Sequence, residues 1–212
     1  GLRIAGNSHL NIYGQANDSG KLIAESATSF LGISTSSRAA IGGNNLEAYG
    51  AVTINGGEIE ASGGNRGAGI GGGQQSRTNS GDSTITGGKV TANGNNNAAG
   101  IGGGDKGAGG TIIVTGGNIT ANGSSNYGTG IGASSRYSGS EPGTLTVGFD
   151  NASDSLKATS YSGAVSVAAA MFNKFPIAGK KVVSLISGGN IDVTSLSRVI
   201  DRGLMTSGRI SS

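Results

Sequence analysis

Aliphatic residues return along the chain at intervals of about thirty positions. The isoleucines at 41, 70, 101 and 131 lie 29, 31 and 30 residues apart, and glycine follows each of them. Two further aliphatic columns keep the same interval through insertions of one or two residues, which a random low-complexity tract would not do. The three columns are Ile41, Ile70, Ile101 and Ile131; Ile54, Ile85 and Val114; and Ile59, Val90 and Ile119.

Each repeat contains three short β-prone pieces, separated by glycine or asparagine corners. Polar residues alternate with aliphatic ones, as Glu58 and Glu60 do around Ile59, so one side of the piece faces inward. A single repeat is too thin to bury that side, and neighbouring repeats must cover it. We therefore predict an all-β fold, a single-stranded parallel β-helix (β-solenoid) of about 30 residues per coil, with three strands and a triangular cross-section.

Glycines stand where such a coil has to turn. The pairs at 56–57, 87–88 and 116–117 follow the second strand of each repeat, where a corner needs positive φ. The triplets at 71–73 and 102–104 indicate that the backbone passes close to another layer of chain. A phosphate-binding loop would need lysine and serine or threonine directly after its last glycine and then a helix, and neither follows here.

Stacking also predicts which outward residues lie side by side. One outward column contains Glu58, Lys89 and Asn118, and the next contains Glu60, Thr91 and Thr120. Glu58 beside Lys89 predicts a cross-strand ion pair worth about 0.2–1 kcal/mol. Asparagines that follow the third strand are expected to turn the chain or to stack as polar ladders; they are Asn65, Asn95 to Asn97 and Asn126.

The pattern divides the chain into three parts. We expect residues 1–38 to form an irregular N-terminal coil, residues 39–148 the glycine-rich repeats, and residues 149–212 a β-rich C-terminal extension or cap with a tail. The extension is either extra sheet packed on the solenoid end or wider coils that continue it. The apolar cluster at 170–177 is interpreted as a cap or as a contact to a partner subunit, and residues 196–204 as a short helix or a donated strand.

Composition narrows the chemistry. With 43 glycines in 212 residues and 4% aromatic residues, a core of large side chains is not expected. Cysteine is absent and His9 is the single histidine, so we expect no disulfide, metal site or cofactor, and His9 is treated as an ordinary polar residue.

Charge and hydropathy exclude two further classes of protein. The 15 basic and 12 acidic residues are spread along the chain, which argues against nucleic-acid binding. Apolar runs stay well short of the about 20 residues that a transmembrane segment needs. The chain opens with Gly1 and no signal-peptide pattern, so we expect a processed product or an excised piece.

The blocks Gly67-Ala68-Gly69-Ile70-Gly71-Gly72-Gly73 and Ala98-Ala99-Gly100-Ile101-Gly102-Gly103-Gly104 are each followed by a Thr-Ile-x-Gly-Gly type of strand. They resemble glycine-rich (GAGIGGG-type) β-helix repeats of large surface and secreted proteins of bacteria. The stretch Ser155 to Val167 resembles the segment that often follows those repeats, so the likeness covers about residues 40 to 168. The resemblance implies a parallel β-helix in a cell-surface or adhesin-like protein, extracellular and bacterial.

Catalysis is not expected, because the acids are scattered and the sequence shows neither a recurring carboxylate pair nor a metal with a base, the groups that polysaccharide chemistry uses. We expect a non-catalytic extracellular scaffold or adhesin-like protein. Two alternatives stay open: a self-assembling filament or appendage subunit, and a carbohydrate-binding or polysaccharide-active β-helix.

The expected partners are a glycan or a host-surface protein, or copies of the chain joined end to end through unpaired strand edges. For ligand binding, tyrosine rings could act as stacking platforms beside outward polar side chains. The candidate ligand-binding residues are Glu60, Thr91, Thr120, Tyr127 and Tyr137, with Tyr49 as a further platform.

Overall fold

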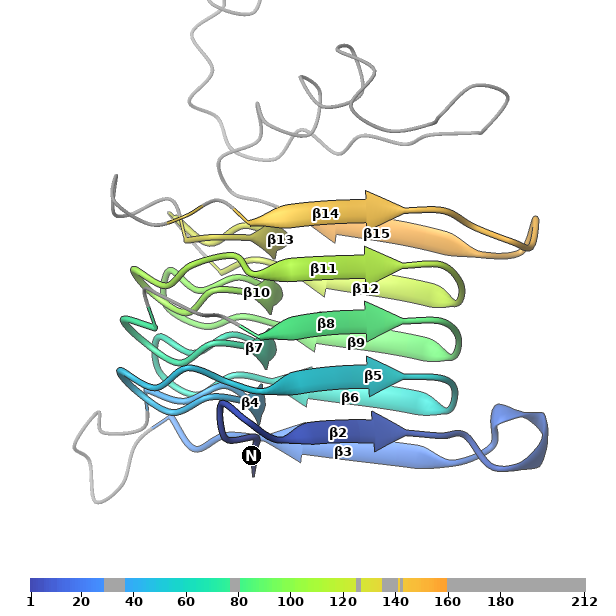
Figure 1. Cartoon of the computed structure of the whole chain (residues 1–212), viewed down its shortest axis with the longest axis horizontal. Coiled ribbons are helices and arrows are strands. Elements are labelled where there is room, and N and C mark those ends of the chain that lie inside the picture. The colour runs from blue at the N-terminus through green and yellow to red at the C-terminus, as the bar shows by residue number, and fades with distance from the viewer. Residues whose placement is uncertain (29–36, 77–80, 125–126, 135–140, 142, 160–212) are drawn as a thin grey trace, which may run out of the picture.

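A computed structural model of the chain shows five stacked coils of parallel β-strands (Figure 1). It describes residues 1–28, 37–76, 81–124, 127–134, 141 and 143–159. Within these residues every coil contributes one strand to each of three five-stranded parallel sheets, and the one helical element is η1, a 3-10 turn at Ala16–Asp18. The predicted all-β parallel β-helix is confirmed.

The three sheets differ in the length of their strands. The short sheet contains β1 (Leu2–Arg3), β4 (Ile41–Gly42), β7 (Ile70–Gly71), β10 (Ile101–Gly102) and β13 (Ile131–Gly132). The β2 sheet contains β2 (His9–Ile12), β5 (Ala51–Ile54), β8 (Asp82–Ile85), β11 (Thr111–Val114) and β14 (Thr144–Val147). The β3 sheet contains β3 (Lys21–Glu25), β6 (Glu58–Ser62), β9 (Lys89–Asn93), β12 (Asn118–Asn122) and β15 (Ser155–Thr159).

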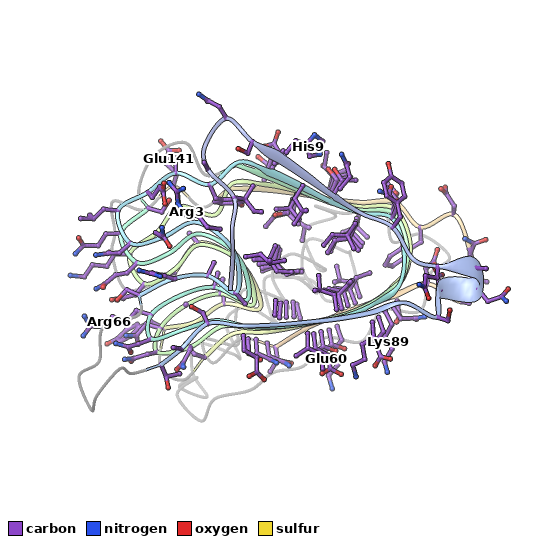
Figure 2. All side chains as sticks on the ribbon, turned by 90° about the horizontal axis from the view of Figure 1, so that it is seen from below. Arg3, His9, Glu60, Arg66, Lys89 and Glu141 are labelled. Atoms are coloured by element: carbon purple, nitrogen blue, oxygen red, sulfur yellow. The ribbon has the colours of Figure 1, made fainter. Side chains whose placement is uncertain are left out.

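The β2 and β3 sheets form the two long walls of the coil, and their strands run in opposite directions (Figure 1). The short sheet closes one side between them, and side chains fill the space inside (Figure 2). Inward and outward residues alternate along the walls, as the burial of β6, β9 and β12 shows. The coil is therefore three-sided, as the sequence predicted.

Equivalent aliphatic residues stack directly on one another through the interior. Ile70 pairs with Ile41 on one side and Ile101 on the other, and Ile101 pairs with Ile131. The first three are fully buried. Each buried side chain of this size stabilises the fold by about 1.5–3 kcal/mol relative to exposure. A shift of one residue between coils would turn a whole column outward, so the register is strongly specified.

Glycine corners repeat with the coil. Gly57, Gly88 and Gly117 have φ values of 89°, 86° and 94°, a region that glycine occupies without steric cost. In the short sheet, Gly71 has a φ of 132°, and a Cβ placed on it would meet the carbonyl oxygen of Gly102. The predicted close approach of two layers of backbone at the glycine triplets is confirmed there.

The first and last coils differ from the others at the corner between the two walls. Residues 13–20 and 148–154 form longer connections there than the three-residue corners of the inner coils. Each carries an aspartate that reaches the next coil: Asp18 Oδ1 accepts from the Gly57 amide at 3.2 Å, and Asp154 Oδ1 from the Gly117 amide at 3.0 Å. Both end coils thus satisfy a backbone donor at a glycine corner.

The two ends of the described stack bear on the predicted division of the chain. Residues 1–25 supply three strands that pair in register with the second coil. The fifth coil includes β14 and β15, which lie on either side of residue 149. Residues 149–159 therefore continue the solenoid, while the apolar cluster at 170–177 and the segment at 196–204 lie outside the described residues.

We predict that Gly71→Ala will lower the free energy of unfolding by at least about 2 kcal/mol, because the new Cβ meets backbone that cannot move aside and φ is positive. Gly148 is the matched control, since nothing lies within 4 Å of a Cβ built there. Urea denaturation followed by circular dichroism measures both variants. Equal stability of Gly71→Ala and Gly148→Ala would show that the layers do not approach closely at Gly71.

Candidate functional site

The outer face of the β3 sheet carries three of the predicted ligand-binding residues in one column. Glu60 lies beside Thr91, and Thr91 beside Thr120. Their columns continue to Ile23 in the first coil and Lys157 in the last. The sequence therefore predicted the placement of these side chains, and their role in binding stays a prediction.

Ion pairs occupy the same face around the first three coils (Figure 2). Lys21 Nζ lies 2.8 Å from Glu60 Oε1 and 3.7 Å from Glu58 Oε1, and Lys89 Nζ lies 3.1 Å from Glu58 Oε1. The predicted pair between Glu58 and Lys89 is confirmed. The hydrogen bond from Lys89, helped by the charge of Lys21, lowers the pKa of Glu58, and the hydrogen bond to Glu60 raises the pKa of Lys21.

Side-chain amides form a second column on this face. Asn122 Nδ2 donates to Asn93 Oδ1 at 2.9 Å, and Asn93 Nδ2 reaches Ser62 Oγ at 3.4 Å. Further along the coil, Asn96 Nδ2 donates to Asn65 Oδ1 at 2.7 Å, which confirms the predicted stacking of asparagines there. The Asn93 and Asn122 ladder was missed, although their spacing of 29 residues could have revealed it.

The tyrosines do not join this column. Tyr127 is 47% exposed and lies in the connection between β12 and β13, and Tyr137 lies outside the described residues. Tyr49 is 1% exposed, so the expectation of a stacking platform there is wrong. An antiparallel bridge between Ala5 and Tyr49 holds the backbone against the first coil, and the side chain is buried.

Burial also changes the chemistry of the Tyr49 hydroxyl. Loss of hydration raises its pKa to about 12, with the Ser83 hydroxyl acting in the opposite direction and the Asp82 charge in the same one. The phenol is neutral over the physiological range, because burial disfavours the charged form. Tyr49 therefore contributes to packing and cannot serve as a surface acid or base.

A buried carboxylate lies among the loops that follow the short sheet, where the repeat pattern gave no warning of it. Asp105 is fully buried, and its Oδ2 lies 3.8 Å from Nε of Arg66 in the preceding coil. The backbone joins the same loops, because the Asp105 amide donates to the Arg66 carbonyl and the Gln75 amide donates to the Asp105 carbonyl. The ion pair thus ties neighbouring coils together outside the aliphatic interior.

A cavity of about 240 Å³ lies at the N-terminal end of the stack, away from the candidate column. Gly1, Arg3, Ser26 and Arg38 are among its lining residues. Arg3 is engaged by Glu47, with Nε 3.0 Å from Oε2, and this contact lowers the pKa of Glu47. Across the described ranges, no group of three or more His, Cys, Asp or Glu residues is placed to hold a metal ion.

Comparison with known proteins agrees with the coil geometry. A family model described as "Beta helix repeat" matches residues 52–74 and 84–105. Each match begins on the β2 sheet, passes through the β3 sheet and ends just after the short sheet. The chain contains β-helix repeats. Among the described residues, no helix is long and apolar enough to cross a membrane.

A second similarity is to a curated enzyme. L-threonine ammonia-lyase of Thermotoga maritima is 57% identical over 47 residues, which cover 22% of this chain and 12% of that protein. The chain thus matches about one eighth of the length of this relative. No solved structure matches the chain.

Acidification should weaken the fold. The pKa values of Glu47 and Glu58 lie below their usual 4.5 in the folded chain, so their contribution is present above pH 4.5 and is lost as the pH falls through the folded values. We predict a free energy of unfolding that declines as the pH drops below about 4.5. Glu58→Gln should decline less steeply in urea titrations at a series of pH values; a slope equal to that of the parent chain would contradict the pairing.

Breaking the buried ion pair should also cost stability. Arg66→Gln keeps the side-chain stem but removes the charge beside Asp105, and we expect a loss of about 2 kcal/mol, less than for a fully buried pair because the Arg66 side chain is 40% exposed. The double variant Arg66→Gln/Asp105→Asn should recover most of the loss. Equal losses in the single and double variants, measured by urea denaturation, would rule out an uncompensated carboxylate as the cause.

Proposed function

We propose that the chain is a non-catalytic structural module of a bacterial protein that acts at the cell surface or outside the cell. The observation that supports this proposal most is the continuity of the three sheets through all five coils. Each coil is held by its neighbours alone, so the coils form a rod whose length follows the number of repeats. Such a rod suits the spacing or display of other parts of a protein.

The chemistry of the outer face also favours a structural role. Glu58 and Glu60 are the paired outward acids of the second coil, and both are engaged by lysines of neighbouring coils. Acid–base catalysis would instead need carboxylates held at a set separation around a substrate. The similarity to L-threonine ammonia-lyase covers 12% of that protein, too small a share to carry an activity to this chain.

Placement outside the cell rests on the likeness of the glycine-rich blocks to repeats of bacterial surface and secreted proteins. Immunogold labelling of intact cells of a bacterium that encodes the chain tests this placement. Label on the outside of unbroken cells, equal to the label found after permeabilisation, is the expected result. Label that appears only after permeabilisation would contradict the proposed location.

Glycan binding on the β3 sheet is a second candidate function. It is supported by the hydroxyls of Thr91 and Thr120, which lie in register on an outward face, beside the hydrogen bond from Ser155 Oγ to Asn118 Oδ1 at 2.9 Å. Stacked coils would repeat these groups about every 4.8 Å along the rod, which suits an extended sugar chain.

A glycan array tests this candidate with two matched variants. Thr91→Val removes one hydroxyl from the column and keeps the shape of the side chain, while Thr84→Val makes the same change on the β2 sheet. Selective binding that falls at least about tenfold in Thr91→Val and is kept in Thr84→Val supports the candidate, a loss of about 1.4 kcal/mol. Absence of binding, or equal binding by both variants, would exclude this face as the site.

A further inference from the structure

Strand β3 lies at the N-terminal edge of its sheet and pairs on one side with β6. The Gly20 carbonyl and the Ser26 amide bond to the second coil. Backbone groups of successive strand residues point to alternate sides, so the N–H and C=O groups of Lys21, Ile23 and Glu25 face away from that coil. The Glu25 carbonyl accepts the Gly1 amine at 2.7 Å, and the edge at Ile23 is open to another strand.

The same edge is apolar on both faces of the strand. Ile23 points outward and is 56% exposed, and Leu2 of the short sheet is 41% exposed. Leu10 and Leu22 are half-buried, whereas Val52 and Ile59, their neighbours in the second coil, are buried. Another layer of chain would remove this surface from water, at about 25 cal/mol per Å² of apolar area.

The sequence of β3, Lys21-Leu22-Ile23-Ala24-Glu25, is complementary to itself when two copies run antiparallel. Such a pair centred on Ile23 places Lys21 opposite Glu25 of the second copy and Leu22 opposite Ala24 of the second copy. The outward-facing backbone groups of Lys21, Ile23 and Glu25 then form the hydrogen-bonded pairs of an antiparallel ladder. Opposite charges, apolar residues and backbone groups all meet their complements.

We propose that two copies of this chain form a symmetric dimer through their N-terminal coils, with β3 paired antiparallel to β3 about Ile23. A two-fold axis perpendicular to the sheets also sets β2 against β2 of the second copy, because β2 and β3 run in opposite directions on facing walls (Figure 1). The contact uses one surface of each chain and closes on itself. The inference is independent of the proposed scaffold role.

Head-to-tail stacking is the competing arrangement, and the charges favour it less. Continuing the register of the β3 sheet would place Ser155 beside Lys21, Lys157 beside Ile23 and Thr159 beside Glu25. Neither Lys21 nor Glu25 would gain an opposite charge, and an ammonium group would lie against an exposed isoleucine. The antiparallel contact pairs both charges and keeps Ile23 against Ile23.

Single cysteines distinguish the two arrangements, because the chain contains no native cysteine. In the proposed dimer the two copies of Ile23→Cys have Cα atoms about 5.5 Å apart, within the range of a disulfide. Head-to-tail stacking would separate them by five coils, about 24 Å. Thr120→Cys is the control on the same face, since the dimer would hold its two copies roughly 34 Å apart, seven coil spacings.

The expected result is a covalent dimer of Ile23→Cys on mild oxidation, seen on a non-reducing gel, with Thr120→Cys remaining monomeric. Equal cross-linking of the two variants would indicate random collision and overturn the proposal. So would the absence of cross-linked Ile23→Cys at concentrations where the parent chain sediments as a dimer.

Sedimentation equilibrium of the cysteine-free chain provides the second measurement. The parent chain should approach twice its mass of 20.6 kDa with rising concentration. Ile23→Asp and Glu25→Lys should weaken dimerisation at least about tenfold by placing like charges opposite each other, while Thr120→Asp should leave it unchanged. A parent chain that stays monomeric, or that forms an open series of larger species, would overturn the proposal.

Discussion

Backbone pairing between coils, with every coil in the same register, is the constraint on which the rest of this structure depends. One coil has too little apolar surface to fold alone, and stacking covers its aliphatic residues with those of the next. The hydrogen bonds of the three sheets fix that stacking, as Ile70 between Ile41 and Ile101 illustrates. Order in a chain with 43 glycines thus comes from repetition of the same contacts.

The register also decides what the outer surface can do. It brings Glu58 between Lys21 and Lys89, so that residues up to 37 positions apart in the sequence form one network of ion pairs. The same register sets Thr91 beside Thr120 and Asn93 beside Asn122. Outward chemistry on this fold therefore comes in rows, and any ligand-binding surface has to be built from equivalent positions of successive coils.

Sequence periodicity predicted the features that repeat and missed those that do not. The aliphatic columns, the corner at Gly57 and the pair between Glu58 and Lys89 all follow from a thirty-residue interval. Tyr49 and Asp105 stand outside the columns, so their burial could not be inferred, because it depends on loop contacts with other coils. The exposed edge at Ile23 likewise required knowing that β3 lies at the end of its sheet.

The most direct measurement of the central claim is the stability of a chain that lacks one repeat. Deleting residues 70–100 joins Gly69 to Ile101, the residue that pairs with Ile70, and every later column moves down by one coil. We expect a cooperative unfolding transition and a β-sheet circular dichroism spectrum. Deleting residues 70–85 instead should abolish cooperative folding, because it brings strands of different sheets together. Equal behaviour of the two deletions would contradict in-register stacking.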